Sequence, residues 1–291
     1  MRITEIFKKQ KHTFSFEFFP PKDEITAVEF GINAGQLMRL QPSFISVTYG
    51  AGGSTQERTF NLVDLFQNKL GLTCMAHYTC VNASAQKVSA DLDYLYSRNI
   101  ENLMLLRGDP PKGQQSFIAT SADFTHASDL IRLAKSQNRF SIGAACYPEM
   151  HIESRDTDED MQFVKEKTEA GADFLVTQMF FDNSFYYRFV ERARAAGITC
   201  RIIPGIIPVI NYHQIKKFVE VSNATIPRQL ATILESYKDN EKKSYQIGVD
   251  LAINQCEDLL NHGAPGIHFY TLNKSRAVID IYESLSLRYK C

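Results

Sequence analysis

Eight short apolar segments recur along the chain at intervals of roughly 30 residues, and they constrain its fold more than any other feature. Each segment is a nearly continuous run of apolar residues bounded by turn-forming residues, which is typical of strands covered on both faces. The eight segments are residues 14–19, 44–49, 73–79, 102–107, 141–147, 174–181, 201–209 and 266–272.

Helical spacing fills the stretches between these segments. Apolar and small residues recur at helical intervals in residues 161–172, 212–219 and 251–258, and Gly171 and Gly263 are suited to end the first and last of these helices. Pro227 is expected to open an extra helix in the longest interval. Strand and helix alternating eight times predict a single-domain (β/α)8 TIM barrel of the α/β class, spanning residues 1–291.

A doubly wound parallel sheet is the rival fold. For dinucleotide binding it would need a GxGxxG turn directly after the first strand. The segment FSFEFFPPK at residues 14–22 contains no glycine, so the barrel is favoured.

Composition excludes several classes of function. A formal net charge of -1 over 291 residues argues against nucleic acid as the main partner. No apolar run approaches the ~18 residues of a membrane span, and the first residues do not read as a signal peptide. The six cysteines form no CxxC pair, so we expect buried thiols and a reducing, cytoplasmic location.

Polar residues lie at the ends of seven of the eight predicted strands. In a parallel barrel the carboxyl ends of the strands meet at one rim, where the chemistry of such folds is found. We therefore expect one shared mouth lined by Glu17, Thr48, Tyr49, His77, Thr79, Arg107, Gly108, Asp109, Tyr147, Glu149, His151, Thr177, Gln178, Thr271, Asn273 and Lys274.

Several of these residues also have a purely structural interpretation. Glu17 lies among phenylalanines, where a carboxylate is costly unless it is paired or protonated, so it is either a proton-transfer group or half of a buried ion pair, for example with Arg107. His77 could be a hydrogen-bonded core histidine. Asp109 precedes two prolines and could only shape a turn.

Two further features remain ambiguous. The glycine-rich loop at residues 50–55 suits either a phosphate cradle or a flexible turn. Asp160, Phe163 and Lys167 share one face of a predicted helix, and a surface salt pair is the simplest account of them.

The residue types limit the reaction. Lys274 is the one lysine near a strand end that could form a Schiff base, and the histidines at 77, 151 and 268 lie on separate strands with no HxH pair, so a metal site is not expected. No serine or cysteine stands in a nucleophile-elbow context. One acid, several hydrogen-bonding side chains and aromatic surfaces suit a protein that positions a redox cofactor.

Seven motifs, spread from about residue 14 to residue 274, resemble the bacterial, single-domain type of the methylenetetrahydrofolate reductase family. They are FSFEFFPPK, SVTYGAGGSTQERT, LMLLRGD, AACYPEMH, TQMFF, IIPGIIPV and HFYTLNKS. The resemblance implies a barrel with tightly, non-covalently bound FAD at its mouth. It also implies ping-pong transfer of hydride from NADH or NADPH to FAD, and then to 5,10-methylenetetrahydrofolate, which becomes 5-methyltetrahydrofolate for methionine synthesis.

The resemblance also implies roles for single residues. Glu17 matches the acid that protonates the folate and opens its five-membered ring, and Asp109 matches a carboxylate that acts near both flavin and pterin. Matches to substrate contacts are Asp109, Gln178, Gln214, Phe218 and Lys274. Matches to FAD contacts are Tyr49, His77, Arg107, Gly108, Asp109, Ala127, Tyr147, His151, Asp160 and Lys167, with Thr48 beside the nicotinamide.

The chain departs from the family pattern at Lys274, where better-known bacterial members have arginine. A lysine lacks the bidentate fork for a carboxylate, so contact with the glutamate tail of the folate is expected from either Lys274 or Arg276. The resemblance further implies a homo-oligomer without inhibition by S-adenosylmethionine, and ferredoxin or a partner flavoprotein remains an alternative electron donor.

Two rival functions stay open from the sequence. One is another FAD barrel, such as a proline dehydrogenase. The other is a folate- or flavin-binding protein without turnover, although a mere binder has no need for the costly acids Glu17 and Asp109.

Overall fold

The structure of the protein is a computed structural model, and it describes residues 1–50, 56–80, 83–108, 124–210, 215–216, 219 and 222–289. Its strands form one sheet in which every neighbouring pair is parallel, in the order β7-β6-β5-β4-β3-β2-β1-β9-β8. The strands are β1 (Thr13–Phe18), β2 (Phe44–Val47), β3 (Cys74–Thr79), β4 (Asn102–Leu106), β5 (Ser141–Cys146), β6 (Phe174–Thr177), β7 (Arg201–Ile203), β8 (Gly205–Ile206) and β9 (Gly266–Tyr270).

The sheet closes through a strand that is split at a proline. β7 pairs with β6, whereas β8 pairs with β9. Pro204 lies between them and has no N–H to donate, but its carbonyl accepts a hydrogen bond from the backbone N–H of His268 at 2.9 Å. β7 and β8 thus act as two halves of the seventh predicted strand, and the predicted (β/α)8 TIM barrel is confirmed.

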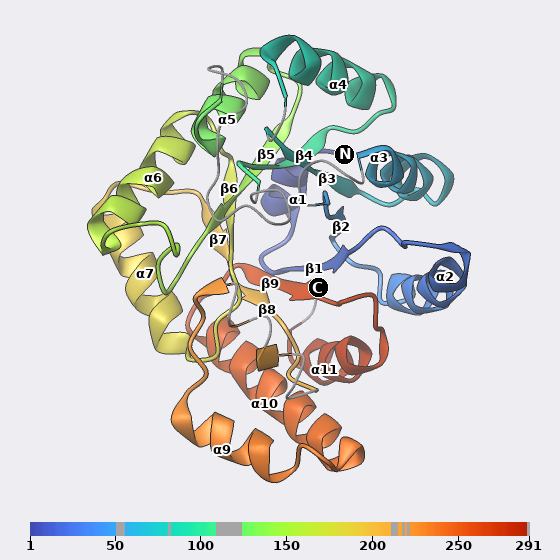
Figure 1. The fold of residues 1–291 in the computed structure, drawn as a ribbon, viewed down its shortest axis with the longest axis vertical. Helices are drawn as coiled ribbons and strands as arrows, with labels where there is room; N and C mark the ends of the chain where they lie inside the picture. The colour runs from blue at the N-terminus through green and yellow to red at the C-terminus, as the bar shows by residue number, and fades with distance from the viewer. Residues whose placement is uncertain are drawn as a thin grey trace.

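Helices surround the strands, as Figure 1 shows. They are α1 (Ile3–Lys9), α2 (Glu24–Met38), α3 (Gln56–Asp64) with its π-helical extension η2 (Leu65–Lys69), α4 (Ala85–Ser97), α5 (Ala127–Ser136), α6 (Thr157–Glu169), α7 (Asn183–Ala195), α9 (Arg228–Ser236), α10 (Glu241–Asn261) and α11 (Arg276–Ser286).

The expected helix ends are mostly confirmed. α6 and α10 stop just before Gly171 and Gly263, whose φ angles of 118° and 87° lie in the left-handed region that favours glycine. Pro227 immediately precedes α9 as its N-cap and is not its first helical residue, a shift of one position from the expectation. Of the helix expected at 212–219, only residues 215, 216 and 219 are described, and they are helical.

The described residues form two main parts of the core and a third, small cluster around Met179, Ile207 and Val209. The larger one lies between the strands and the outer helices, and a smaller one fills the amino-terminal end of the barrel beneath α1. Among the described cysteines, Cys74, Cys80, Cys146 and Cys256 are buried as expected and Cys200 is half-buried. In the described parts of the chain, no helix is both long and apolar enough to cross a bilayer.

Candidate active site at the carboxyl end of the barrel

A cavity of about 700 Å³ opens at the carboxyl ends of the strands. Strands β1 to β6, the loops after them and the first turns of α5 and α6 supply most of its wall. The predicted site residues on this wall are Glu17, Thr48, Tyr49, His77, Arg107, Gly108, Ala127, Tyr147, His151, Asp160, Lys167 and Gln178. Residues 17, 77 and 178, which are far apart in the chain, therefore share one cavity.

Other predicted positions cannot be placed in this way. Asp109, Gln214 and Phe218 lie outside the described residues, as do residues 51–55 of the glycine-rich loop. Lys274 is described but is not on the cavity wall, because its ammonium group pairs with the carboxylate of Glu29 on α2. The Arg276 guanidinium lies over the ring of Tyr245, 4.5 Å from its centre.

Glu17 points from β1 into the cavity and is only 6 % exposed. Its Oε2 lies 3.4 Å from Nε2 of His77, on the cavity wall, and 3.4 Å from Nε2 of His268, which is fully buried in β9. Ser15 in turn lies 2.7 Å from the other ring nitrogen, Nδ1, of His268. The partners of the carboxyl group are thus two imidazoles. The alternative of an ion pair with Arg107 is wrong.

Opposing effects act on the protons of this cluster. Burial alone would raise the pKa of Glu17, but the hydrogen bond from His268 and the positive potential of His77 and His268 outweigh it and lower that pKa. Burial lowers the pKa of His77, against the attraction of the Glu17 carboxylate. The protonation states of Glu17 and His77 therefore depend on opposing effects, and a ligand that enters the cavity can change them.

Two polar atoms on the wall have no hydrogen-bond partner within the described residues. They are Nε2 of His77, whose contact with the Glu17 carboxylate lacks hydrogen-bond geometry, and Oγ1 of Thr79, on side chains that are 7 % and 6 % exposed. An unmade hydrogen bond at a buried group is costly, so such groups usually meet a ligand or water. Both belong to β3 and line the cavity. His77 is therefore not the hydrogen-bonded core histidine of the structural alternative.

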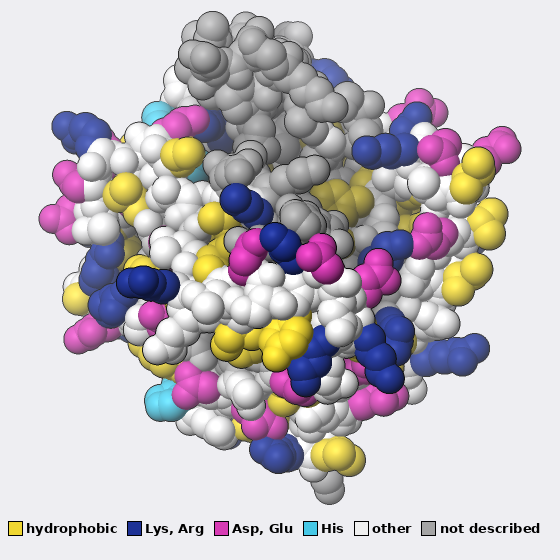
Figure 2. All heavy atoms as spheres, turned by 60° about the horizontal axis from the view of Figure 1, so that its bottom comes forward, with side chains coloured by type: hydrophobic (Ala, Val, Ile, Leu, Met, Phe, Trp, Pro, Cys, Tyr) yellow, Lys and Arg dark blue, Asp and Glu magenta, His cyan; other side chains and the backbone are white. Residues whose placement is uncertain are grey.

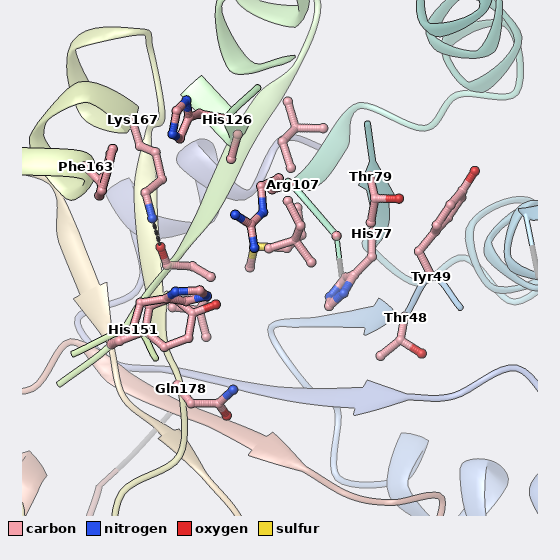
Figure 3. A pocket seen from close by; sticks show the side chains of 18 of the residues that line it. Thr48, Tyr49, His77, Thr79, Arg107, His126, His151, Phe163, Lys167 and Gln178 are labelled. Carbon is pink, nitrogen blue, oxygen red and sulfur yellow. Dashed lines mark hydrogen bonds between the residues drawn. The ribbon is translucent and has the colours of Figure 1, made fainter. Parts of the chain in front are cut away.

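A second region of the wall carries charged groups of both signs. Arg107, at the end of β4, makes a bidentate pair with Glu153, with N–O distances of 2.6 and 2.8 Å. This pair lowers the pKa of Glu153, mainly through the hydrogen bond from the Arg107 guanidinium. In Figure 3 the guanidinium projects into the middle of the pocket, between His151 on one side and His77 on the other.

The α6 face predicted from spacing lines the same region. Lys167 donates from Nζ to the carbonyl of Ala145 at 2.8 Å (Figure 3), and burial lowers its pKa. Asp160, 3 % exposed, accepts hydrogen bonds at Oδ1 from the backbone N–H of His151 and from Ser154, each at 3.1 Å. Because Asp160 is buried in the wall, the interpretation of this face as a surface salt pair is wrong.

Several wall residues were not predicted from the sequence. His126, the N-cap of α5, stacks on Phe163 of α6 with ring centres 5.1 Å apart, and both side chains line the cavity. The amino-terminal end of α5 borders the cavity, which is favourable for a bound anion, whereas the first N–H groups of α6 are capped by the Asp156 side chain. The polar residues among 151–155 indicate from the sequence that this region lies near the site. No pattern around His126 indicates that it does.

Some polar residues at strand ends have structural roles away from the cavity. Thr177 accepts a hydrogen bond at Oγ1 from the backbone N–H of Gly205, and Thr271 donates to the backbone carbonyl of Glu17. Asn273 binds the backbone of Phe19, and Glu149 accepts hydrogen bonds from the backbone N–H of Thr225. The expectation that all of the strand-end residues line one mouth is therefore wrong for these four. Their side chains join neighbouring loops and strands.

The comparisons with known proteins agree with this architecture. The family model for methylenetetrahydrofolate reductase matches residues 2–286. The 5,10-methylenetetrahydrofolate reductase of Escherichia coli is 34% identical over 274 residues, which cover 94% of this chain and 90% of that protein. Methylenetetrahydrofolate reductase (NADH) 1 of Arabidopsis thaliana is 35% identical over 98% of this chain, and the chain spans 50% of that relative's length.

Solved structures share the fold at low sequence identity. An uncharacterized protein from Clostridium thermocellum that binds two copies of 5-methyl-5,6,7,8-tetrahydrofolic acid superposes with a TM-score of 0.64 at 13% identity, over 97% of this chain and 96% of that one. The fold, the family match over nearly the whole chain and the Escherichia coli relative agree. The chain belongs to the methylenetetrahydrofolate reductase family.

Proposed function

We propose that this protein reduces 5,10-methylenetetrahydrofolate to 5-methyltetrahydrofolate, with FAD as its bound cofactor and NADH or NADPH as its electron donor. The observation that carries the proposal is the buried carboxyl group of Glu17 on the wall of a cavity of about 700 Å³ at the carboxyl ends of the strands. The names of two plant relatives specify NADH, which favours NADH as the electron donor of this protein. The product would supply methyl groups for methionine synthesis.

The residues around the cavity fit FAD. Its volume of about 700 Å³ lies within the range of cofactor sites. Nε2 of His77 and Oγ1 of Thr79, which make no hydrogen bond within the described residues, offer hydrogen bonds to a heteroaromatic ring. When bound, FAD supplies hydride chemistry, accepting a hydride from the nicotinamide and passing it to the folate carbon.

Charge on the wall suits the diphosphate of the cofactor. Arg107 and Lys167 supply cations, and the amino-terminal end of α5 supplies backbone N–H groups. Glu153 holds the Arg107 guanidinium in place by a bidentate pair. Tyr49, Gly108, Ala127, Tyr147, His151 and Asp160 would complete the cofactor wall, and Asp109 would join it from outside the described residues.

Glu17 would act as the general acid. It donates a proton to a nitrogen of the methylene-bridged ring of the folate and so opens that ring. A general acid must hold a proton at neutral pH, whereas the two imidazoles lower the pKa of this carboxyl group. A flat ligand over the cluster would exclude water from the carboxylate and raise that pKa, and His77 and His268 would be the nearest proton donors.

The same cavity would serve both half-reactions in turn. Thr48 would lie beside the nicotinamide, and Gln178 would bind the pterin that replaces it. The substrate contacts of Gln214, Phe218 and Lys274, with Arg276 as the alternative for the glutamate tail, remain part of the proposal. Because the two substrates share one site, the donor must leave before the folate binds, which is ping-pong behaviour.

A turnover experiment tests the proposal and its rivals. The purified protein, loaded with FAD, should be yellow and should release flavin when denatured. It should oxidise NADH in the presence of 5,10-methylenetetrahydrofolate, with NADPH as the comparison donor. Turnover of proline without folate would favour a proline dehydrogenase instead. Tight folate binding without any turnover would favour a binding protein.

A further inference from the structure

Three polar side chains lie in the interior of the barrel beneath Glu17. Charged side chains are spread over the face of the molecule that Figure 2 shows, whereas Ser15, Ser46 and His268 are each 0 % exposed. The interior of such a barrel is usually filled by layers of branched apolar residues. Polar groups buried there cost stability unless they are paired, so packing alone does not account for these three.

The register of three parallel strands brings these side chains together. Ser15 on β1 is the partner of His268 on β9, and Glu17, two residues further along β1, is the partner of Ser46 on β2. Because side chains alternate between the two faces of a strand, Ser15 and Glu17 point to the same side, which is the inside of the barrel. The imidazole of His268 therefore reaches from the level of Ser15 to the level of Glu17.

Both ring nitrogens of His268 have polar neighbours. Nδ1 lies 2.7 Å from Oγ of Ser15. Nε2 lies 3.4 Å from Oε2 of Glu17 and 3.5 Å from Oγ of Ser46. The ring of Phe44 stacks on the imidazole, with ring centres 6.2 Å apart. The ring is thus held in one orientation, with one nitrogen on a serine and the other toward the acid.

The two imidazoles beside Glu17 differ in their access to a ligand. His77 is on the cavity wall, and its Nε2 makes no hydrogen bond within the described residues, so a bound ligand can engage it. His268 is fully buried and does not line the cavity. It can therefore act on a ligand only through the Glu17 carboxyl group.

We propose that His268, held by Ser15, is a positioning residue that stores the proton for Glu17. This role rests on the function proposed above and identifies the source of the proton in it. With the cavity open, the proton is on Nε2 of His268, and Nδ1–H donates to Ser15. When a ligand excludes water, the proton moves from Nε2 to Oε2 of Glu17, because two neutral groups cost less than two charges in a dry site. Glu17 then gives it to the folate nitrogen, and His268 remains a neutral imidazole with its hydrogen on Nδ1.

The titratable groups around His268 in the described structure leave the proton to this pair. Besides Glu17 on β1 they are His77 on β3 and Tyr270 on β9, whose ring packs edge-on against the imidazole at 5.5 Å. Burial raises the pKa of Tyr270 well above its ordinary value, so this hydroxyl stays neutral. Burial lowers the pKa of His77, which favours its neutral form. His268 regains its proton from water, through Glu17, when the product leaves and the cavity opens.

Anaerobic stopped-flow spectroscopy of the FAD-loaded protein tests this role. His268→Gln keeps an N–H group near Glu17 but cannot store a proton, so it should slow reduction of 5,10-methylenetetrahydrofolate about 10- to 100-fold. Reduction of the flavin by NADH, which needs no acid, should stay within a few-fold of the wild type. Ser15→Ala disturbs the interior less, and should His268→Gln not fold it provides the same test, with an expected slowing of about fivefold. Thr13→Val is the matched control, because it removes a hydroxyl from the same face of β1 at a residue that is also 0 % exposed, and it should change neither step.

The pH dependence separates a proton store from a structural role. A proton shared by two sites is held to a higher pH than a proton bound at one of them alone. As the pH rises, the rate of the folate step should therefore fall at a lower pH in His268→Gln than in the wild type. A histidine that only packs the interior would slow the step without moving that fall.

NMR of the ligand-free protein with isotopically labelled histidine reports on the imidazole without any turnover. The signal that His268→Gln removes should show a hydrogen that stays on Nδ1 and a hydrogen on Nε2 that is lost as the pH rises. A neutral ring with its hydrogen on Nε2 would overturn the proposal, and so would His268→Gln with the rates and pH profile of the wild type. A wild-type protein that does not reduce the folate would overturn the proposed function and this role with it.

Discussion

The two ends of the barrel differ in what covers them. At the amino-terminal end, α1 covers the strands and places Ile3 and Ile6 in an apolar cluster with Phe44 and Phe174. The first N–H group of that helix, at Ile3, donates to Oδ1 of Asn102 at 2.7 Å. At the carboxyl end, by contrast, a cavity opens, and Nε2 of His77 and Oγ1 of Thr79 on its wall make no hydrogen bond within the described residues.

This difference separates stability from function within one fold. Apolar burial at the closed end stabilises the barrel, although Oγ1 of Thr13 at the start of β1 also has no hydrogen-bond partner within the described residues. The open end keeps a buried acid and unmade hydrogen bonds, both of which cost stability in the free protein. Residues at the closed end should therefore affect unfolding, and residues at the open end should affect binding and chemistry.

The largest expected effect lies at the open end. Glu17→Gln should slow reduction of 5,10-methylenetetrahydrofolate by the flavin about 10³-fold, because it removes the proton that opens the ring. Reduction of the flavin by NADH should stay within a few-fold of the wild type. Anaerobic stopped-flow spectroscopy measures both half-reactions separately. Equal losses in both would show that Glu17 is not the acid.

The next effect should appear at the closed end. Ile6→Ala removes a side chain that is 5 % exposed, and it should lower the free energy of unfolding by about 2–4 kcal/mol. Urea titration gives this difference, and turnover per folded molecule should not change. A loss of turnover without a loss of stability would contradict the division between the two ends.

A smaller effect is expected at the charged part of the cavity wall. Arg107→Gln should weaken FAD binding about 10- to 100-fold by removing a charge-assisted hydrogen bond. The matched variant Glu153→Gln keeps the guanidinium and should not weaken FAD binding. Fluorescence titration of the apoprotein with FAD gives both dissociation constants. If only Glu153→Gln lowers the affinity, the carboxylate is the cofactor contact.

The smallest effect concerns pH. Burial lowers the pKa of His77 below its ordinary value of 6.5, so between the two values the unfolded chain binds more protons at this position. The free energy of unfolding should therefore rise with pH through this window, and His77→Asn should make that rise shallower. Urea midpoints of the ligand-free protein at several pH values test this. His151, whose pKa burial also lowers, is retained in both proteins. An unchanged slope would mean that folding does not shift the pKa of His77.

The eight strands were predictable because strands covered on both faces have continuous apolar runs. The position of the cavity followed from fold geometry, since polar residues at carboxyl strand ends must meet at one rim. The partners of individual side chains were not predictable. The Arg107–Glu153 pair and the His268 ring beneath Glu17 depend on rotamers and on register between distant strands. The sequence also did not predict that α1 covers the amino-terminal end of the barrel. Ile3 and Ile6 form too short a pattern to indicate which residues they contact.

The most direct test of the central claim is a crystal structure of the protein reconstituted with FAD. We predict the flavin ring at the carboxyl ends of the strands, bordered by Glu17, His77 and Gln178, with the diphosphate near Arg107 and Lys167. A flavin bound elsewhere, with this cavity filled only by solvent, would contradict the account.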